Sequence, residues 1–269
     1  MTTKGFEELL SSKSKQNILG EVFSVPFKDR MTQFIVVNHQ SSNNDAPEEE
    51  EPCGEFIDVI NINNENIMIN SSVWDNSYHL TDQKIPLVFS RSSLSMILQD
   101  LKDELPNYII DRIVERHDYI KTSIERPIEG GIEGGVNFTC KINSTCIGDI
   151  WLPSITEIFG RGYFSDDDST GRIFPYFKSL DHRINLFDIS SLATTDSITT
   201  GFRTSTSSNR TMWTRSTLFM NEKASVYFVL LKPLEVKTLD SLDYTVTYDY
   251  WNRTTHCCGV PASMRLRID

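Results

Sequence analysis

Apolar and polar residues alternate in several short segments of the chain, and this period of two predicts β-strands. Residues 22–38 are typical of a β-hairpin around a polar turn at 28–30. Residues 224–231, rich in β-branched and aromatic side chains, are the most strand-like segment. At the C-terminus, apolar residues alternate with Arg265 and Arg267, which predicts a strand with one buried face. Further strands are predicted at 56–60, 67–69, 138–142 and 244–251.

Helical periodicity is strongest between residues 92 and 120. Apolar residues recur there at the spacing of one helix face, and Pro106 divides the segment into two predicted helices. The second helix is expected to direct Arg112, Glu115 and Arg116 outward, and the pair would cover one face of a sheet. A shorter helix is predicted within 5–18. Residues 1–20 would then form an N-terminal arm that docks on a partner or on its own domain, and 21–269 a single domain.

Residues 150–160 predict a sharp corner between a strand and a helix. A short apolar strand ends at Pro153, and Ser154 stands three residues before Glu157. This is the spacing of a capping box, in which the serine oxygen accepts from a free backbone N–H and the glutamate accepts from the serine N–H. A helix is therefore predicted to begin after Ser154.

Two tryptophans are predicted to lie in the core beside this corner. Trp151 and Trp213 would be buried rings whose N–H groups need acceptors. Arg215 follows Trp213 closely, and we expect it to form a buried ion pair with Glu157 that ties the corner to the last strands. All of these residues, Ser154 included, are assigned structural roles.

The composition is typical of a soluble globular protein, with 39% hydrophobic and 23% charged residues and a formal net charge of −11. The chain has no cluster of basic residues, so nucleic-acid binding is not expected. It also has no apolar run of the length that a membrane helix or a signal peptide requires, so a membrane location is not expected either. These features favour a protein made in a cytoplasm.

The cysteines and acidic runs do not predict a metal site or a cofactor. The chain has an odd number of cysteines, in positions that lack the spacing of zinc modules: Cys53, Cys140, Cys146, Cys257 and Cys258. The main interpretation is that they are reduced thiols, although a zinc site with His256 and a Cys140–Cys146 disulfide stay open. Asp166, Asp167 and Asp168 lack the alternating spacing of a calcium loop.

A series of short motifs gives the chain a family resemblance. The motifs are Trp74-Asp75-Asn76-Ser77, Ser93-Leu94, Trp151-Leu-Pro-Ser-x-x-Glu, Trp213-x-Arg-Ser and Gly259-Val-Pro-Ala. The order resembles an uncharacterised domain family of bacterial and phage proteins that is similar to C-type-lectin-like folds. Two departures are an extra residue after Trp74 and a missing arginine between Val260 and Pro261. The resemblance implies an α+β fold, C-type-lectin-like, with mixed sheets, two helices and long irregular loops from residue 22 onward.

Three function classes follow from these observations. The sequences around the five histidines contain neither Gly-x-Ser-x-Gly nor His-Glu-x-x-His, so an enzyme is not expected. The resemblance favours a non-catalytic bacteriophage virion component, such as a head decoration, fibre or tail protein. Such a protein would be a homo-oligomer, held to other virion proteins by the N-terminal arm. It could also bind a host-surface glycan or protein. The alternative is a lectin-like module of a bacterial protein that binds carbohydrate or protein, with Tyr248, Tyr250 and Trp251 as the candidate binding residues.

Overall fold

The computed structural model describes a mixed α+β protein with mostly antiparallel strands and short helices. The α+β class predicted from the sequence is therefore confirmed. The described residues are 4–11, 18–40, 54–62, 89–127, 136–159, 173–179, 182, 192–194, 209–220, 223–231, 244–250 and 260–269.

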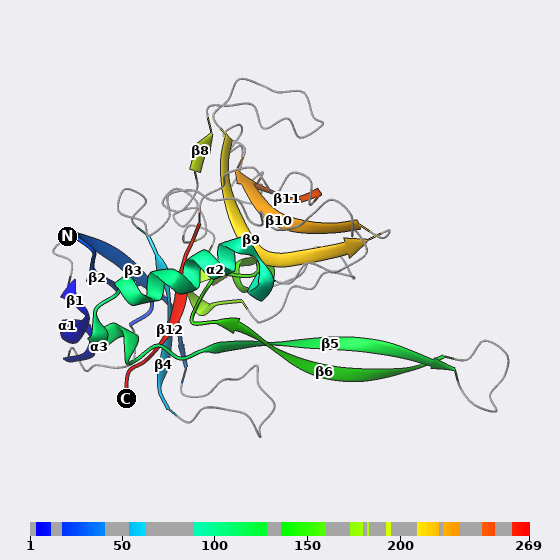
Figure 1. The fold of residues 1–269 in the computed structure, drawn as a ribbon, viewed down its shortest axis with the longest axis horizontal. Coiled ribbons are helices and arrows are strands. Elements are labelled where there is room, and N and C mark those ends of the chain that lie inside the picture. Colours follow the sequence, from blue (N-terminus) through cyan, green and yellow to red (C-terminus); the bar gives the residue numbers. More distant parts are fainter. Residues whose placement is uncertain are drawn as a thin grey trace.

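A six-stranded sheet forms the centre of the described structure (Figure 1). Its strands pair antiparallel except for β1 and β2, which are parallel. In spatial order they are β1 (Lys4–Gly5), β2 (Val22–Phe27), β3 (Arg30–Gln40), β4 (Phe56–Asn61), β12 (Ser263–Arg267) and β7 (Ile150–Trp151). The C-terminal strand thus lies inside the sheet, where β4 and β7 pair with its two edges, and its residues 263–266 are buried on both faces.

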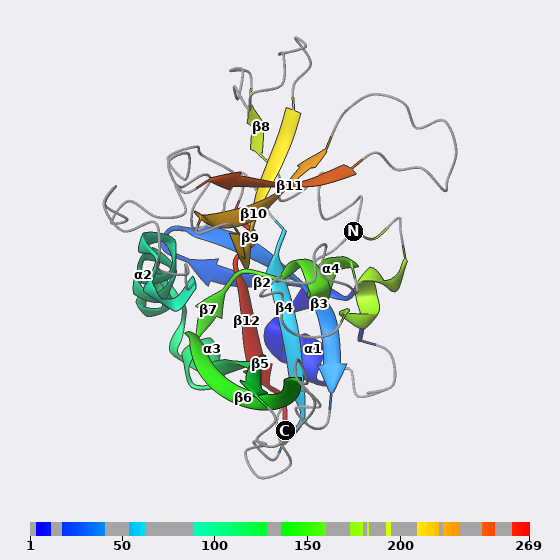
Figure 2. The same cartoon turned by 90° about the vertical axis from the view of Figure 1, so that its right-hand side faces the viewer.

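Two further sheets extend from this body. A four-stranded sheet contains β11 (Tyr244–Tyr250), β10 (Lys223–Leu231), β9 (Asn209–Met220) and β8 (Leu192–Thr194) in that order. The strands β5 (Arg116–Pro127) and β6 (Val136–Gly148) pair only with each other among the described strands. Figures 1 and 2 show the four-stranded sheet above the body, and Figure 1 shows the β5–β6 hairpin projecting to one side.

Helices are short and pack their apolar residues on the body. They are α1 (Phe6–Ser11), α2 (Ser93–Asp100), α3 (Asn107–Ile110), α4 (Ile155–Phe159) and the 3-10 turns η2 (Phe89–Arg91), η3 (Leu101–Glu104) and η4 (Pro175–Lys178). The Ser92 hydroxyl caps α2 by accepting from the Ser95 N–H at 3.1 Å, and Leu94 and Leu98 are buried. None of the described helices is both long and apolar enough to cross a membrane.

The N-terminal helix is part of the body. Phe6 and Leu9 of α1 are buried, and the Phe6 ring lies 5.1 Å from the ring of Phe23 on β2. Of the two positions expected for residues 1–20, docking on the chain's own domain is the one found for residues 4–11. Residues 1–3 and 12–17 lie outside the described part.

The second helix predicted before residue 120 is wrong in length and in the direction of one side chain. The helix α3 ends at Ile110, and Ile113 already forms a β-bridge with Leu266 of β12. Arg116, expected to point outward, is buried at the start of β5. The helical spacing of apolar residues continues past Ile110 in the sequence. In the structure, however, the backbone there forms sheet hydrogen bonds instead of helical ones, such as that from the Val114 N–H to the Arg265 carbonyl.

The strand β12 carries a buried ion pair on the face that the sequence assigned to solvent. Arg265 is buried with Asp58 of β4, donating from Nε to Oδ1 at 2.7 Å and from Nη2 to Oδ2 at 3.1 Å. Asn38 of β3 adds a 2.8 Å hydrogen bond to Oδ2. Arg265 and Asp58 are direct cross-strand partners, so the pair satisfies both charges within the sheet.

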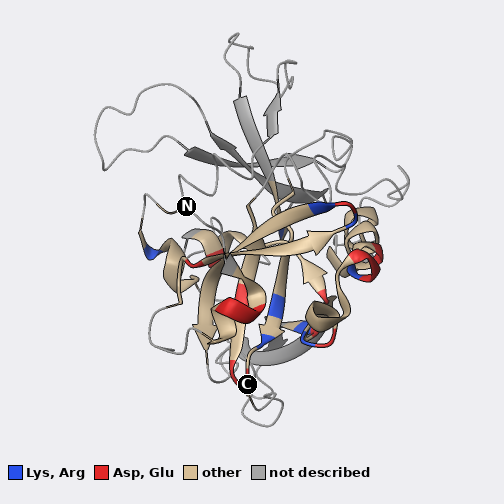
Figure 3. Cartoon of the chain, turned by 90° about the vertical axis from the view of Figure 1, so that its left-hand side faces the viewer, with Lys and Arg blue, Asp and Glu red and all other residues tan. Residues whose placement is uncertain are grey.

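Charged residues of both signs occur along the described ribbon (Figure 3). Exposed acidic residues begin α1 and end η3, at Glu7, Glu8, Asp103 and Glu104. By contrast, five described charged side chains are buried: Asp58, Arg116, Glu157, Arg215 and Arg265. Asp58 and Arg265 pair within the six-stranded sheet, whereas Arg116 and Arg215 both bind Glu157 and so join different sheets.

Asp58 makes stability sensitive to acid. Burial alone would raise the pKa of Asp58, but the charge and hydrogen bonds of Arg265, the charge of Arg116 and the Asn38 amide together hold it below the ordinary value of 3.8. The stabilisation is therefore complete above pH 3.8 and is lost as the pH falls through the lower pKa of the folded state.

Urea unfolding of Asp58→Asn should show a loss of about 3–5 kcal/mol in the free energy of unfolding at neutral pH. It should also show a flatter acid limb than the wild type, whereas the exposed Asp111→Asn control should keep that limb.

Candidate functional site

The corner predicted at residues 150–160 has the expected capping box. The Glu157 N–H donates to the Ser154 hydroxyl at 3.1 Å, and the Ser154 N–H donates to Glu157 Oε2 at 2.8 Å. Both hydrogen bonds fix the first turn of α4 directly after the short strand β7. Glu157 is fully buried.

Arg215 of β9 meets this carboxylate, and the ion pair predicted between them is present. The Arg215 Nη2 donates to Glu157 Oε1 at 2.8 Å, and Nη1 donates to Oε2, so the pair is bidentate. The same Nη1 also donates to the Leu152 carbonyl at 2.8 Å. A backbone hydrogen bond also supports the junction, because the Arg215 N–H donates to the Pro153 carbonyl at 3.1 Å. The pair thus joins the four-stranded sheet to the corner.

A second guanidinium, from Arg116, reaches the same carboxylate from the hairpin. Its Nη2 donates to Glu157 Oε1, and its planar head lies over the Trp151 ring, 4.2 Å from the ring centroid. Sequence analysis placed Trp151 and Trp213 in the core, and both are buried. Arg116 Nη1 and Trp151 Nε1 are buried without a hydrogen-bond partner, so the acceptor expected for the Trp151 N–H is missing.

Arg116 begins β5, and its neighbours in the chain are less buried than Arg116 itself. Successive side chains of a strand alternate between faces. Arg116 is buried, whereas His117, the next residue of β5, is half-buried and Glu115, which stands directly before β5, is exposed. His117 pairs across the hairpin with Cys146 of β6, next to a register shift between Arg116 and His117. The root of the hairpin therefore has a buried cation and, beside it, three less buried potential metal ligands.

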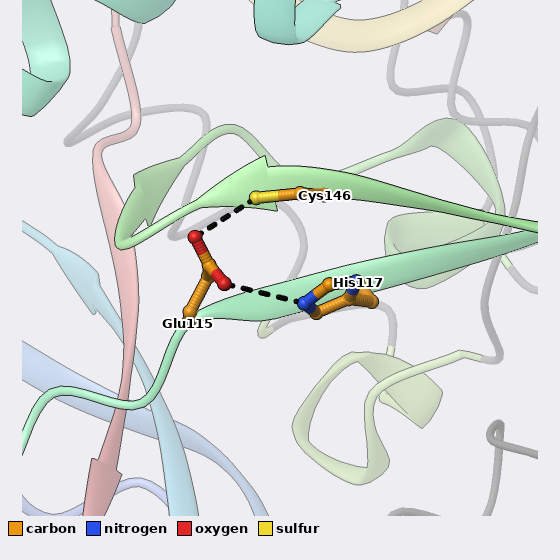
Figure 4. A group of neighbouring side chains, drawn as sticks. All are labelled: Glu115, His117 and Cys146. Atoms are coloured by element: carbon orange, nitrogen blue, oxygen red, sulfur yellow. Dashed lines mark hydrogen bonds and ion pairs between the residues drawn. The ribbon is translucent and has the colours of Figure 1, made fainter. Parts of the chain in front are cut away.

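These three ligands form a compact cluster at the root of β5–β6 (Figure 4). The Cys146 thiol lies 3.0 Å from Glu115 Oε1, and His117 Nε2 lies 3.3 Å from Glu115 Oε2. One ligand atom from each residue lies within 4.8 Å of the others. Glu115 is exposed, whereas the other two are half-buried, so a solvated ion can approach.

Electrostatics in the cluster favour a protonated thiol and an ionised carboxylate. Burial raises the pKa of Cys146 to about 11, and the hydrogen bond to Glu115 and its negative charge act in the same direction. The hydrogen bond from Cys146 lowers the pKa of Glu115 against a smaller effect of burial, helped by His117. The thiol therefore donates to a carboxylate that carries the negative charge of the cluster.

The helix α2 fixes the hairpin root from one side. Gln99 accepts from the Asp149 N–H at 2.9 Å and donates to the Ile150 carbonyl at 2.6 Å. Gly148 has φ +102°, and a Cβ atom there would lie 2.7 Å from the Gln99 amide nitrogen. Lys102 adds an ion pair with Asp149 at 2.7 Å. Only glycine permits this approach, and the root is held where β6 meets β7.

The other candidate residues are not brought into this cluster. Tyr248 and Tyr250 lie on β11, at the edge of the four-stranded sheet, and their side chains are not described. Several candidates lie outside the described residues: Trp251, the Asp166–Asp168 run, Cys53, Cys257, Cys258 and His256. Cys140 lies on β6, six residues from Cys146, and the zinc set considered from the sequence shares only Cys146 with the cluster found.

Sequence reasoning missed Glu115 and His117. The available signal was a Glu-x-His spacing, which places two ligands on one face of a strand. The helix predicted for this segment concealed it, since residues two apart do not share a helix face.

Comparison with known proteins adds no relative. None of the family models, the curated proteins and the solved structures matches the chain.

Glu157 should dominate the stability of the junction. Glu157→Gln leaves the Arg116 and Arg215 guanidinium groups buried without their counter-charge, and the free energy of unfolding should fall by about 3–5 kcal/mol. Asp149→Asn is the matched control, because it removes a half-exposed partner of Lys102 and should cost less than about 1 kcal/mol. Equal losses in urea unfolding of the two variants would contradict the central role of Glu157.

Proposed function

We propose that the chain is a non-catalytic structural or recognition component of a bacteriophage particle, with a C-type-lectin-like body. Two arguments support this function. The motif series from Trp74 to Gly259 resembles a domain family of bacterial and phage proteins. The single structural observation that carries the proposal is the β5–β6 hairpin, which leaves the body as a long ribbon (Figure 1).

The hairpin has the properties of a docking element. Its strands are 12 and 13 residues long, which corresponds to about 40 Å of ribbon. A two-stranded ribbon is marginally stable alone, and its outer edges present unpaired backbone N–H and C=O groups. In the described structure no third strand pairs with either edge. A strand from a neighbouring subunit would satisfy those groups by β-augmentation.

The occupant we propose for these edges is a neighbouring copy of this chain in the particle. The β5–β6 hairpin is called the hairpin arm from here on. Homo-oligomers repeat one contact, so the hairpin arm of each subunit can bind the body or the hairpin arm of the next. The root of the arm is rigid enough to set the direction of that contact, because Gln99, Arg116 and Glu157 hold it to the body. We therefore assign assembly to the hairpin arm and not to the N-terminal arm of residues 1–20, since α1 is packed on its own body.

Shortening the arm tests this function. Replacing residues 120–143 by Asn-Gly closes the hairpin at the cross-strand pair Tyr119 and Ser144 and removes most of both edges. The shortened chain should keep a wild-type melting temperature, since the removed ribbon has no other sheet partner in the described structure. We expect it to lose self-association in sedimentation experiments. It should also be absent, by mass spectrometry, from particles purified from host lysates, in which the wild-type chain has a stoichiometric copy number.

The matched control shortens only the tip. Replacing residues 128–135 by Asn-Gly retains the pair Pro127 and Val136 and all of both strand edges, so this variant should assemble as the wild type does. Assembly of the chain shortened at 120–143, or absence of the wild-type chain from particles, would refute the proposal.

A lectin-like binding module is the second candidate. It is favoured by the position of β11, which carries Tyr248 and Tyr250 at the edge of the four-stranded sheet and leads directly to Trp251. Aromatic residues at such an edge can stack on sugar rings or form a protein interface.

Glycan-array binding distinguishes the two candidates. If the module binds sugars, the wild-type chain should bind a defined set of glycans, and Tyr250→Ala with Trp251→Ala should reduce that binding at least about tenfold, the loss of one stacking contact. The chain shortened at 120–143 serves as the control, because it retains β11. Unchanged binding by the double variant would exclude these aromatics as the sugar site.

A further inference from the structure

We propose that Glu115, His117 and Cys146 bind one Zn²⁺ ion at the root of the β5–β6 hairpin (Figure 4). The site is independent of the proposed assembly function, since all three ligands lie at the root of the hairpin, outside the segment 120–143 assigned to assembly. His117 lies on β5, Glu115 stands directly before that strand, and Cys146 lies on β6, so the ion would join the start of β5 to β6 where the hairpin leaves the body.

The chemistry of the donors selects zinc. Thiolate, imidazole and carboxylate are the three side chains that bind Zn²⁺, whereas Ca²⁺ and Mg²⁺ require oxygen donors throughout. The ion takes the place of the proton that the Cys146 thiol donates to Glu115. A thiolate, a carboxylate and a neutral imidazole together neutralise the two positive charges of the ion.

The geometry is close to that of a tetrahedral site. Zinc bonds of about 2.0–2.3 Å place neighbouring ligand atoms roughly 3.3–3.8 Å apart. Cys146 Sγ lies 3.0 Å from Glu115 Oε1, and His117 Nε2 lies 3.3 Å from Glu115 Oε2, so each of the other two ligands faces its own carboxylate oxygen. The widest separation, within 4.8 Å, closes by about 1 Å through side-chain rotation. Water completes the tetrahedron at the solvent side, where Glu115 is exposed.

The position of the site determines what the ion does. Arg116 is buried and holds β5 to Glu157, while the zinc ligands are exposed or half-buried. The ion therefore adds a cross-strand link beside the ion pair, at the register shift between Arg116 and His117. Zinc would stiffen the root of the arm and raise the melting temperature of the folded chain.

Metal titration of the full-length chain tests this site. Zinc should bind at one equivalent per chain, and Co²⁺ as a substitute should give a thiolate-to-cobalt charge-transfer band. Cys146→Ser and His117→Gln should each weaken zinc binding at least about 100-fold, beyond the 10–100-fold effect of losing an outer-shell partner. Cys140→Ser is the matched control, since the same substitution falls on β6 about 20 Å away, and it should bind as the wild type does.

A second measurement keeps the test valid if a variant does not fold. In the wild-type chain, zinc should protect Cys146 from alkylation, as read by mass spectrometry of its peptide. Absence of the cobalt band, the same band and affinity in Cys146→Ser, or unprotected Cys146 at saturating zinc would overturn the proposal. The chain shortened at 120–143 retains all three ligands and should still bind zinc, so failure of the metal site and failure of the assembly proposal are distinguishable.

Discussion

The buried carboxylate of Glu157 is the interaction on which the junction of the three sheets depends. An ionised group without water costs several kcal/mol unless hydrogen bonds and opposite charges surround it. Glu157 meets this requirement with Arg116 from the hairpin, Arg215 from the four-stranded sheet and the Ser154 N–H from its own helix turn. Each partner must therefore arrive at one point, which fixes the positions of β5, β9 and α4 relative to β7.

Arg116 connects this junction to the centre of the main sheet. Its charge contributes to the low pKa of Asp58, whose direct partner is Arg265 on β12. The two buried ion-pair groups are therefore electrostatically coupled, and the hairpin root belongs to both. Arg116 is buried between the exposed Glu115 and the half-buried His117, so one short segment supplies an internal anchor and two residues of the outer cluster.

The sequence predicted those parts of the site whose residues are close together or unmistakable in pattern. The three-residue spacing of Ser154 and Glu157 predicted α4, and a conspicuous Trp-x-Arg segment suggested Arg215 as the partner. Arg116 was missed because apolar residues up to Val114 continued a helical period, whereas the sheet supplied stronger long-range hydrogen bonds. Arg265 was missed since its alternation with apolar residues also fits a strand with one face in water. Glu115 and Cys146 are 31 residues apart, and only the hairpin register brings them together.

The assembly role proposed for the hairpin requires a fixed root and an unpaired edge, and among the described strands the hairpin has both. A ribbon attached only by its two strands would sample many directions, so binding to a neighbour would lose the free energy needed to order the ribbon. Gln99 fixes the root through the backbone of Asp149 and Ile150, and Glu157 fixes it through Arg116. The ordering cost is thus met within the folded chain, because the same buried charge that joins the sheets also sets the direction of the arm. This coupling explains why an expensive buried ion pair, rather than an apolar contact, can be useful at the point where the arm begins.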